Sequence, residues 1–297
     1  MRPRKLAAVV CFGLLAACDG PSTVEPAGSP PVRPAVQFGE LEVDGQRRTY
    51  RVYAPLAVDS GPPRALVMAL HDASSNAETF REVTQFDRAA AAGNFVVVYP
   101  ESMGITWNAG FCCGRAPEQG IDDLGFLNGV IDEMLTRYPI DPTRVYATGA
   151  SNGAIMAYQL ACEVPERISG VAAVGGTMVM DGCRPERPVD ILAFHGTKDA
   201  HVPYHGGPTS GSPVPAPSQP ALMELWAQRN GCTQVPATET AGPVTTLTWT
   251  GCHEGTLVRL LSVEGGGHSW FSEEFDGPAG AIDATQVITE TFALSSP

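Results

Sequence analysis

Residues 146–157 read YATGASNGAIMA and contain one G-x-S-x-G motif, GASNG at 149–153. The motif follows a short apolar segment that ends at Thr148, and it precedes a run with helical spacing from Asn152 to Cys162. A strand, a tight turn and a helix in this order form the setting in which a serine nucleophile is held on a strained turn. Because a chain with 32 glycines also produces such a motif by chance, the role of Ser151 depends on the rest of the sequence.

Apolar runs and helical segments alternate on both sides of this motif. The runs typical of strands covered on both faces of a parallel sheet lie at 65–70, 95–99, 145–148, 168–174 and 189–194. Helices are expected at 76–92, 123–137, 152–162, 220–229 and 282–293, and further strands at 245–250 and 256–263. Alternation around Asp44-Gly45 predicts a hairpin of residues 38–43 and 48–53. We therefore expect an α/β fold with a mostly parallel central sheet, helices on both faces and an N-terminal antiparallel hairpin.

The first 35 residues indicate export. A basic start is followed by an apolar stretch at 6–15 and by LAAC at 15–18, which resembles a bacterial lipobox. We interpret 1–18 as a lipoprotein signal peptide with Cys18 as its lipidated residue; the alternative is an ordinary signal peptide with a chance cysteine. Residues 19–35 are rich in Pro, Gly and Ser and predict a tether, and 36–297 form the folded domain. The expected location is extracytoplasmic, either lipid-anchored to the bacterial cell envelope or secreted.

The net charge of −13 argues against nucleic acid and anionic lipid as partners. Membrane attachment is therefore expected only through a lipid anchor at Cys18. The chain contains no C-x-x-C pair, which argues against a zinc ribbon, and Pro203 prevents His201 and His205 from sharing a helix face, which argues against a metal pair there. No metal and no cofactor are expected. Oligomeric state is not indicated.

Six cysteines follow Cys18, an even number that suggests disulfides in an exported protein. Six cysteines allow 15 pairings, and we favour Cys162 with Cys183 and Cys232 with Cys252. Each of these bonds would close a loop worth roughly 3 kcal/mol in the chain-entropy model. The adjacent Cys112 and Cys113 are then either a strained pair or free thiols.

A serine hydroxyl needs a base, and in this topology the acid and the base follow the serine in the order acid, histidine. His268 is the predicted base, because it lies in a glycine loop between the last strand and the last helix. Asp199 is the predicted acid, because it follows Phe194 at the carboxyl end of a strand. Its role would be to hold the tautomer of the imidazole and to stabilise the imidazolium. The alternative for Asp199 is an ordinary turn residue.

An oxyanion hole needs two N–H donors. One is the amide of Asn152, and the second is expected from the loop after 65–70, at Ala73 or Asp72. We expect His71 to pack against this loop or to orient it. Trp107 and Trp270 lie near strand ends at the same edge and are predicted to line an apolar acyl or aryl pocket; the alternative is that both are core residues.

Segments spread in order over most of the chain resemble the extracellular esterase family that includes polyhydroxybutyrate depolymerases, feruloyl and acetylxylan esterases and LpqC-type lipoproteins. The segments are 69–71 (ALH), 98–100 (VYP), 107–108 (WN), 112–114 (CCG), 122–123 (DD) with Phe126, 141–145 (DPTRV), the Ser151 motif, 160–163 (LACE), 195–199 (HGTKD) with 202–204 (VPY), Trp226 before 231–232 (GC), and 265–270 (GGGHSW). The resemblance implies an α/β-hydrolase fold without a metal, a Ser151–Asp199–His268 triad, and hydrolysis of carboxylic esters, often in polymers.

On this basis 36–297 is expected to be an extracytoplasmic serine esterase domain that acts on feruloyl or acetyl-xylan-type esters or on short hydroxyalkanoate esters. Its substrates would then be esters in fragments of plant polysaccharide or polyester. The alternatives are a polyhydroxybutyrate depolymerase and a catalytically weak envelope binding protein that retains the fold. One position departs from the family, which usually has His-Gly where this chain has His71-Asp72. A carboxylate beside the oxyanion hole would repel the developing negative charge if it pointed inward.

Overall fold

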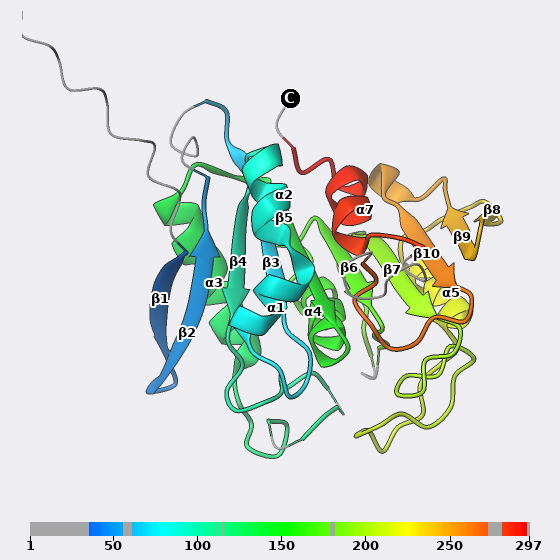
Figure 1. Ribbon diagram of the computed structural model, residues 1–297, viewed down its shortest axis with the longest axis horizontal. Helices are drawn as coiled ribbons and strands as arrows, with labels where there is room; N and C mark the ends of the chain where they lie inside the picture. Colours follow the sequence, from blue (N-terminus) through cyan, green and yellow to red (C-terminus); the bar gives the residue numbers. More distant parts are fainter. Residues whose placement is uncertain are drawn as a thin grey trace, which may run out of the picture. The chain divides into compact units, whose positions relative to one another are not determined.

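The computed structural model describes residues 36–55, 61–110, 112–114, 116–178, 182–272 and 281–295. The predicted signal peptide with Cys18 and the predicted tether lie outside these residues. Within them, ten strands form one sheet in the order β1-β2-β4-β3-β5-β6-β7-β10-β9-β8 (Figure 1). The strands are β1 Gln37–Val43, β2 Gln46–Tyr53, β3 Arg64–Leu70, β4 Val96–Pro100, β5 Ile140–Ala150, β6 Gly170–Val174, β7 Asp190–Gly196, β8 Ala237–Ala241, β9 Val244–Trp249 and β10 Val258–Val263.

The centre of the sheet is parallel and both of its edges are antiparallel. Strands β4, β3, β5, β6, β7 and β10 pair in parallel. The hairpin of β1 and β2 turns at Asp44 and Gly45, both of which have positive φ as this turn requires, and β2 joins β4 antiparallel. At the other edge β9 and β8 continue antiparallel from β10. The predicted mostly parallel sheet with an N-terminal hairpin is confirmed, and β8, every residue of which is exposed, is an addition.

Helices cover both faces of the sheet, as predicted (Figure 1). The helices are α1 Ala77–Thr84, α2 Phe86–Gly93, α3 Asp123–Arg137, α4 Asn152–Glu163, α5 Gln219–Arg229 and α7 Ala284–Thr291, with a short 3-10 helix at His253–Gly255. Successive residues of β3 alternate between two hydrophobic clusters, with Met68 in one and Val67 in the other. Helices α3, α4 and α5 pack into the first cluster, and α1, α2 and α7 pack into the second. No helix in these described parts has the length and apolarity that a membrane crossing requires.

The single helix predicted over 76–92 is wrong in one respect, because the structure breaks it at Gln85. Gln85 adopts a left-handed conformation with φ of 55° and separates α1 from α2. In one continuous helix Phe80 and Phe86 would lie about 240° apart around the axis. The break lets both rings reach the same cluster, where each is almost fully buried.

The described cysteines form three disulfides. Cys162 is bonded to Cys183 and Cys232 to Cys252, which are the pairings favoured from the sequence. Cys112 is bonded to its neighbour Cys113, so of the two alternatives left open for these residues the structure has the adjacent pair.

A buried ion pair joins β2 to the start of α3. The Arg48 guanidinium donates to Asp123 Oδ1 at 2.5 Å, and both side chains are almost completely inaccessible to solvent. The amide of Asn108 donates to the other oxygen of Asp123 at 2.7 Å. The pair, together with the Asn108 amide, therefore fastens the segment between β4 and α3 to β2.

We expect Arg48→Ala to lower the free energy of unfolding by about 3–5 kcal/mol, because it leaves a buried carboxylate without its cation. Urea denaturation followed by circular dichroism measures the change. Arg47→Ala is the matched control, since the neighbouring Arg47 is exposed and pairs with Glu40 only at the surface; its effect should stay within about 0.5 kcal/mol. Equal effects of the two variants would contradict the assignment.

Candidate active site

Ser151 lies on the turn between β5, which ends at Ala150, and α4, which begins at Asn152. Its φ is 51° and its ψ is −115°, a conformation that costs a non-glycine residue energy. The Ser151 amide donates to the carbonyl of Val174 at the end of β6 at 2.9 Å, which helps to hold the turn. The structure therefore has the strand–turn–helix geometry predicted from the motif.

The two glycines of the motif are required by close backbone approaches. A Cβ at Gly149 would lie 2.5 Å from the carbonyl carbon of Gly153. A Cβ at Gly153 would overlap the carbonyl oxygens of Leu70 and His71 at the end of β3. Because these neighbours are backbone atoms that cannot rotate away, both positions exclude a side chain.

Asp199 and His268, 69 residues apart in the sequence, meet at the carboxyl edge of the sheet. His268 Nδ1 lies 2.7 Å from Asp199 Oδ2. The other carboxylate oxygen accepts the amides of His201 and Val202 at 2.8 and 2.9 Å. His195 Nε2 approaches Oδ2 at 3.3 Å, a contact that sequence reasoning did not predict. The carboxylate is thereby held in one orientation, with its side chain fully buried.

The surroundings of Asp199 favour its charged form. Burial by itself raises the pKa of this carboxyl, but the hydrogen bonds from His195 and His268 and from the amide of Val202 outweigh burial and hold the pKa well below its ordinary value. Asp199 is therefore expected to be an anion beside His268 near neutral pH.

This lowered pKa predicts how stability depends on pH. Ionised Asp199 stabilises the folded state above its ordinary pKa of about 4, and that contribution is lost as the pH falls towards the lowered pKa. We expect the destabilisation caused by Asp199→Asn, measured by denaturant unfolding, to be largest near pH 7 and to shrink towards pH 2, by at most about 1.4 kcal/mol per pH unit. Asp190→Asn should show the reverse trend, because burial raises the pKa of Asp190. Parallel pH profiles of the two variants would contradict this prediction.

The loop after β3 is held by the buried ring of His71. Nδ1 of His71 lies 2.8 Å from its neighbour's carbonyl oxygen, that of Asp72, and Nε2 accepts the amide of Ser102 at 3.1 Å. These two contacts assign the proton to Nδ1. Because a trans peptide directs C=O and N–H to opposite sides, fixing the carbonyl of Asp72 also fixes the direction of the Ala73 amide. His71 thus orients the loop expected to supply the second oxyanion donor.

Asn152 contributes its side chain to the same region, which the motif alone did not indicate. Its Oδ1 accepts the amide of Trp107 at 2.6 Å, and its Nδ2 donates to the carbonyl of Trp107 at 3.3 Å. The Asn152 amide belongs to the first turn of α4, whose N–H groups have no intrahelical partner. Asn152 therefore fastens the 101–121 segment to the Ser151 turn while its own amide stays at the helix start.

Trp107 is a buried core residue, which is the alternative that the sequence left open. The side chain has no exposed surface, and its indole N–H donates to the carbonyl of His71 at 2.9 Å. Because a tryptophan at a strand end can pack inward or face the edge, the sequence pattern did not separate these outcomes. Trp107 supports the loop from within the core.

A cavity of about 230 Å³ opens beside Ser151. The described residues that line it are Asp72, Ser75, Thr79, Phe80, Val83, Ala150, Ser151, Val174, Gly175, His268, Ser269 and Trp270. Trp270 is among these lining residues although its side chain is almost fully buried, and its indole N–H is bonded to Thr285 at 3.0 Å. An exposed histidine, His201, lies next to this site, with its ring centroid 5.0 Å from that of His268.

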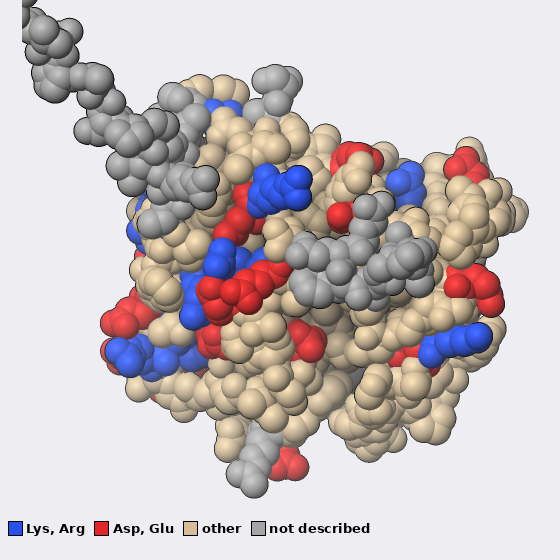
Figure 2. Space-filling model, in the orientation of Figure 1, with Lys and Arg blue, Asp and Glu red and all other residues tan. Residues whose placement is uncertain are grey.

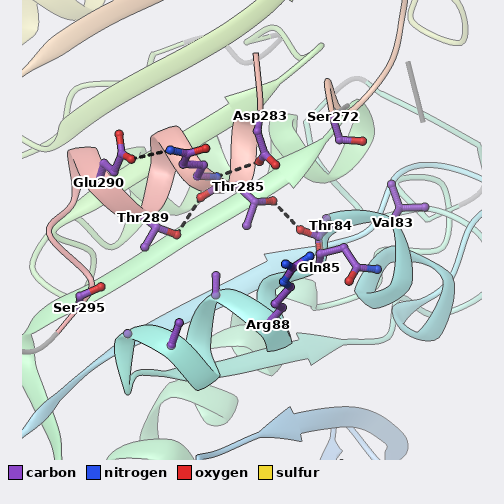
Figure 3. A pocket seen from close by; sticks show the side chains of 14 residues that line it. Val83, Thr84, Gln85, Arg88, Ser272, Asp283, Thr285, Thr289, Glu290 and Ser295 are labelled. Carbon is purple, nitrogen blue, oxygen red and sulfur yellow. Dashed lines mark hydrogen bonds between the residues drawn. The ribbon is translucent and has the colours of Figure 1, made fainter. Parts of the chain in front are cut away.

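A larger cavity of about 800 Å³ lies between α1–α2 and α7 (Figure 3). Its floor is crossed by the hydrogen bond from Thr285 to the carbonyl of Thr84, and polar side chains such as Arg88 and Glu290 line it. Neither Ser151 nor Asp199 nor His268 is among the lining residues. Ser151 and His268 instead line the smaller cavity. No cluster of His, Cys, Asp or Glu suited to a metal occurs in the parts of the chain that the structure describes.

Comparisons with known proteins find similarity to esterases. A model of the phospholipase/carboxylesterase family matches residues 116–212. Feruloyl esterase B of Piromyces equi is 31% identical over 227 residues, covering 72% of this chain and 40% of that protein. The bifunctional acetylxylan esterase/xylanase XynS20E of Neocallimastix patriciarum is 28% identical over 233 residues, covering 76% of this chain and 31% of that protein. The chain thus spans less than half the length of these relatives.

Among solved structures, the acetyl xylan esterase from Aspergillus awamori matches with a TM-score of 0.63 and 14% sequence identity. The match covers 87% of this chain and 100% of the other. At this identity the likeness concerns the fold alone.

Proposed function

Because the chain belongs to the α/β-hydrolase esterases, a family of carboxylic ester hydrolases, we propose that it is a serine esterase that forms an acyl-enzyme on Ser151. The observation that carries the proposal is the contact of 2.7 Å between Asp199 and His268, together with a cavity lined by both His268 and Ser151. These are the three groups of a nucleophile–base–acid arrangement.

The proposed reaction follows from which ring nitrogen of His268 does not face Asp199. Nδ1 of His268 faces Asp199, so Nε2 is the atom that takes the proton from the Ser151 hydroxyl as the oxygen attacks the ester carbonyl. The amides of Asn152 and Ala73 would stabilise the oxyanion. His268 then returns the proton to the leaving alcohol, and a water molecule, activated by the same imidazole, hydrolyses the acyl-enzyme.

The size of the cavity supports a small acyl group. Its volume of about 230 Å³ lies below the roughly 300–1,000 Å³ typical of sites for drug-sized ligands. We therefore favour acetyl, butyryl and short hydroxyalkanoyl esters over feruloyl esters. Fragments of plant polysaccharide or polyester would carry such groups.

We place this esterase outside the cytoplasm, because three disulfides are typical of proteins from oxidising compartments. Attachment through a lipid at Cys18 is part of the same proposal. Metabolic labelling with a palmitate analogue would test it, since Cys18→Ser should abolish incorporation of the label.

Two measurements test the activity. A fluorophosphonate probe should label the purified protein, and mass spectrometry should place the adduct on Ser151. Hydrolysis of 4-nitrophenyl acetate, butyrate and ferulate should then rank the acyl groups, with acetate and butyrate ahead. An unlabelled protein that hydrolyses none of the three esters would favour the binding-protein alternative, and a preference for ferulate would overturn the short-acyl assignment.

A further inference from the structure

His201 is an exposed histidine that lies next to the proposed base but outside the catalytic cavity. Its ring centroid is 5.0 Å from that of His268, and the two rings are tilted by 48°. The side chain is exposed to solvent and is not among the residues that line the cavity of about 230 Å³ beside Ser151. No step of the proposed reaction uses it.

The backbone of His201 is held on both sides. Its amide donates to Oδ1 of Asp199 at 2.8 Å, and its carbonyl accepts the amide of Ser210 at 3.1 Å. Nδ1 of His201 also lies 3.5 Å from the hydroxyl of Ser210. A β-bridge between Gly207 and Ala216 closes the loop further. Because this backbone is already ordered, a ligand that contacts the ring does not have to order the loop first.

The leaving alcohol of a bound ester has to lie beside His268. In the proposed reaction the acyl group occupies the cavity, and the imidazole returns a proton to the alcohol oxygen, so this oxygen lies within hydrogen-bond distance of the ring. The rest of the alcohol extends away from the acyl group. Since His201 adjoins the same imidazole and lies outside the cavity, it is within reach of an alcohol as large as glycerol or a sugar.

The surface around His201 is polar and uncharged. A neutral imidazole donates one hydrogen bond and accepts another, and the hydroxyl of Ser210 does the same, which complements hydroxyl groups of a ligand. From Ala200 to Met223 the chain contains no Lys, Arg, Asp or Glu. The lower right of Figure 2, where the yellow-green loops lie in Figure 1, is mostly tan. This segment therefore offers an ion-pair partner neither to an anionic nor to a cationic alcohol.

We propose that His201, supported by Ser210, contacts the leaving alcohol and favours esters whose alcohol carries free hydroxyl groups. This inference rests on the proposed esterase function and adds to it a residue that determines specificity on the alcohol side of the ester. A hydrogen bond to a hydroxyl remote from the scissile bond forms in the ground state as well as in the transition state. Its loss should therefore raise KM more than it lowers kcat.

Two acetates that differ only in hydroxyl groups test the proposal, glycerol 1-acetate and propyl acetate. The ratio of their kcat/KM values, hydroxylated over plain, should fall about fivefold from the wild type to His201→Phe, which keeps a ring and loses both nitrogens. A fivefold change corresponds to one net hydrogen bond of about 1 kcal/mol. Acetate release by the full chain, followed in a pH-stat over a range of substrate concentrations, gives kcat and KM for each ester.

Two further variants separate hydrogen bonding from damage to the loop. His201→Gln should retain most of the ratio, because its amide both donates and accepts. His205→Phe is the matched control, since His205 is an exposed histidine of the same loop that lines a different cavity, with Lys198 and Glu264; its ratio should equal that of the wild type.

The outcomes distinguish the alcohol contact from the esterase function. An unchanged ratio in His201→Phe, or an equal fall in His205→Phe, would overturn the proposal and leave the esterase function standing. No hydrolysis of either acetate by the wild type would count against the esterase function and overturn the alcohol contact with it.

Discussion

Ser151→Ala is expected to lower kcat for 4-nitrophenyl acetate by about 10⁶-fold and to abolish fluorophosphonate labelling. The proposed reaction passes through a covalent bond to the Ser151 oxygen, and loss of a serine nucleophile removes nearly all of the triad's contribution at once. The residual rate should come from the oxyanion donors and from binding alone, which supply roughly 10³–10⁴-fold over water. The release of 4-nitrophenolate, followed in a stopped or a continuous assay, gives kcat for the wild type and for Ser151→Ala.

The fold should survive this change, because the hydroxyl of Ser151 makes no capping hydrogen bond to α4. Circular dichroism and the urea midpoint should match those of the wild type. Ser169→Ala provides the control, since Ser169 directly precedes β6, at the end of the strand opposite Val174. A Ser151→Ala protein with wild-type activity would remove the basis of the proposed mechanism, whereas Ser169→Ala, purified in the same way, should keep the activity of the wild type.

Asp199→Asn should lower kcat by about 10⁴-fold while leaving KM within a few-fold. An amide can donate to Nδ1 of His268, which stabilises the wrong tautomer and leaves Nε2 protonated and unable to accept the serine proton. The buried position beside His195 makes the carboxylate geometry specific, so Asp199→Glu should also be impaired. Initial rates over a range of substrate concentrations separate kcat from KM.

Asp190→Asn is the control for this substitution. Asp190 begins the same strand, β7, beyond whose far end Asp199 lies, and it accepts the amide of Leu257 at 2.7 Å. Its substitution should leave kcat near that of the wild type. Equal losses of kcat in the two variants would show that the effect of Asp199→Asn arises from damage to the strand and not from the contact with His268.

The sheet and most helices were predictable because their signals are local. A continuous apolar run such as 96–99 has to be covered on both faces, and helical spacing such as that of 123–137 exposes one side and buries the other. Strand β8 carries no such signal, since all five of its residues are exposed and it exists through pairing with β9. The break at Gln85 was also invisible, because it depends on which cluster receives Phe80 and Phe86.

The candidate site also contains residues that the sequence nominated and contacts that only the structure revealed. The order of Ser151, Asp199 and His268 along the chain, each just past a predicted strand, was sufficient to nominate all three. The burial of Trp107 could not be predicted in this way, because the hydrogen bonds that hold this residue, to Asn152 and to His71, join segments that are far apart in the sequence. The support of Asp199 by His195 was missed for a simpler reason, since a histidine in a strand has no signal that distinguishes packing from a carboxylate contact.

The sequence by itself determined the α/β class, the turn that carries Ser151, and the residues nominated as its acid and base, because strand order, glycine spacing and apolar periodicity are properties of short stretches. Only the tertiary structure decided that Trp107 is buried and that Asp72 and Trp270 line one cavity with Ser151. Burial and pairing depend on which surfaces meet across the sheet edge, and those surfaces come from loops separated by up to about two hundred residues.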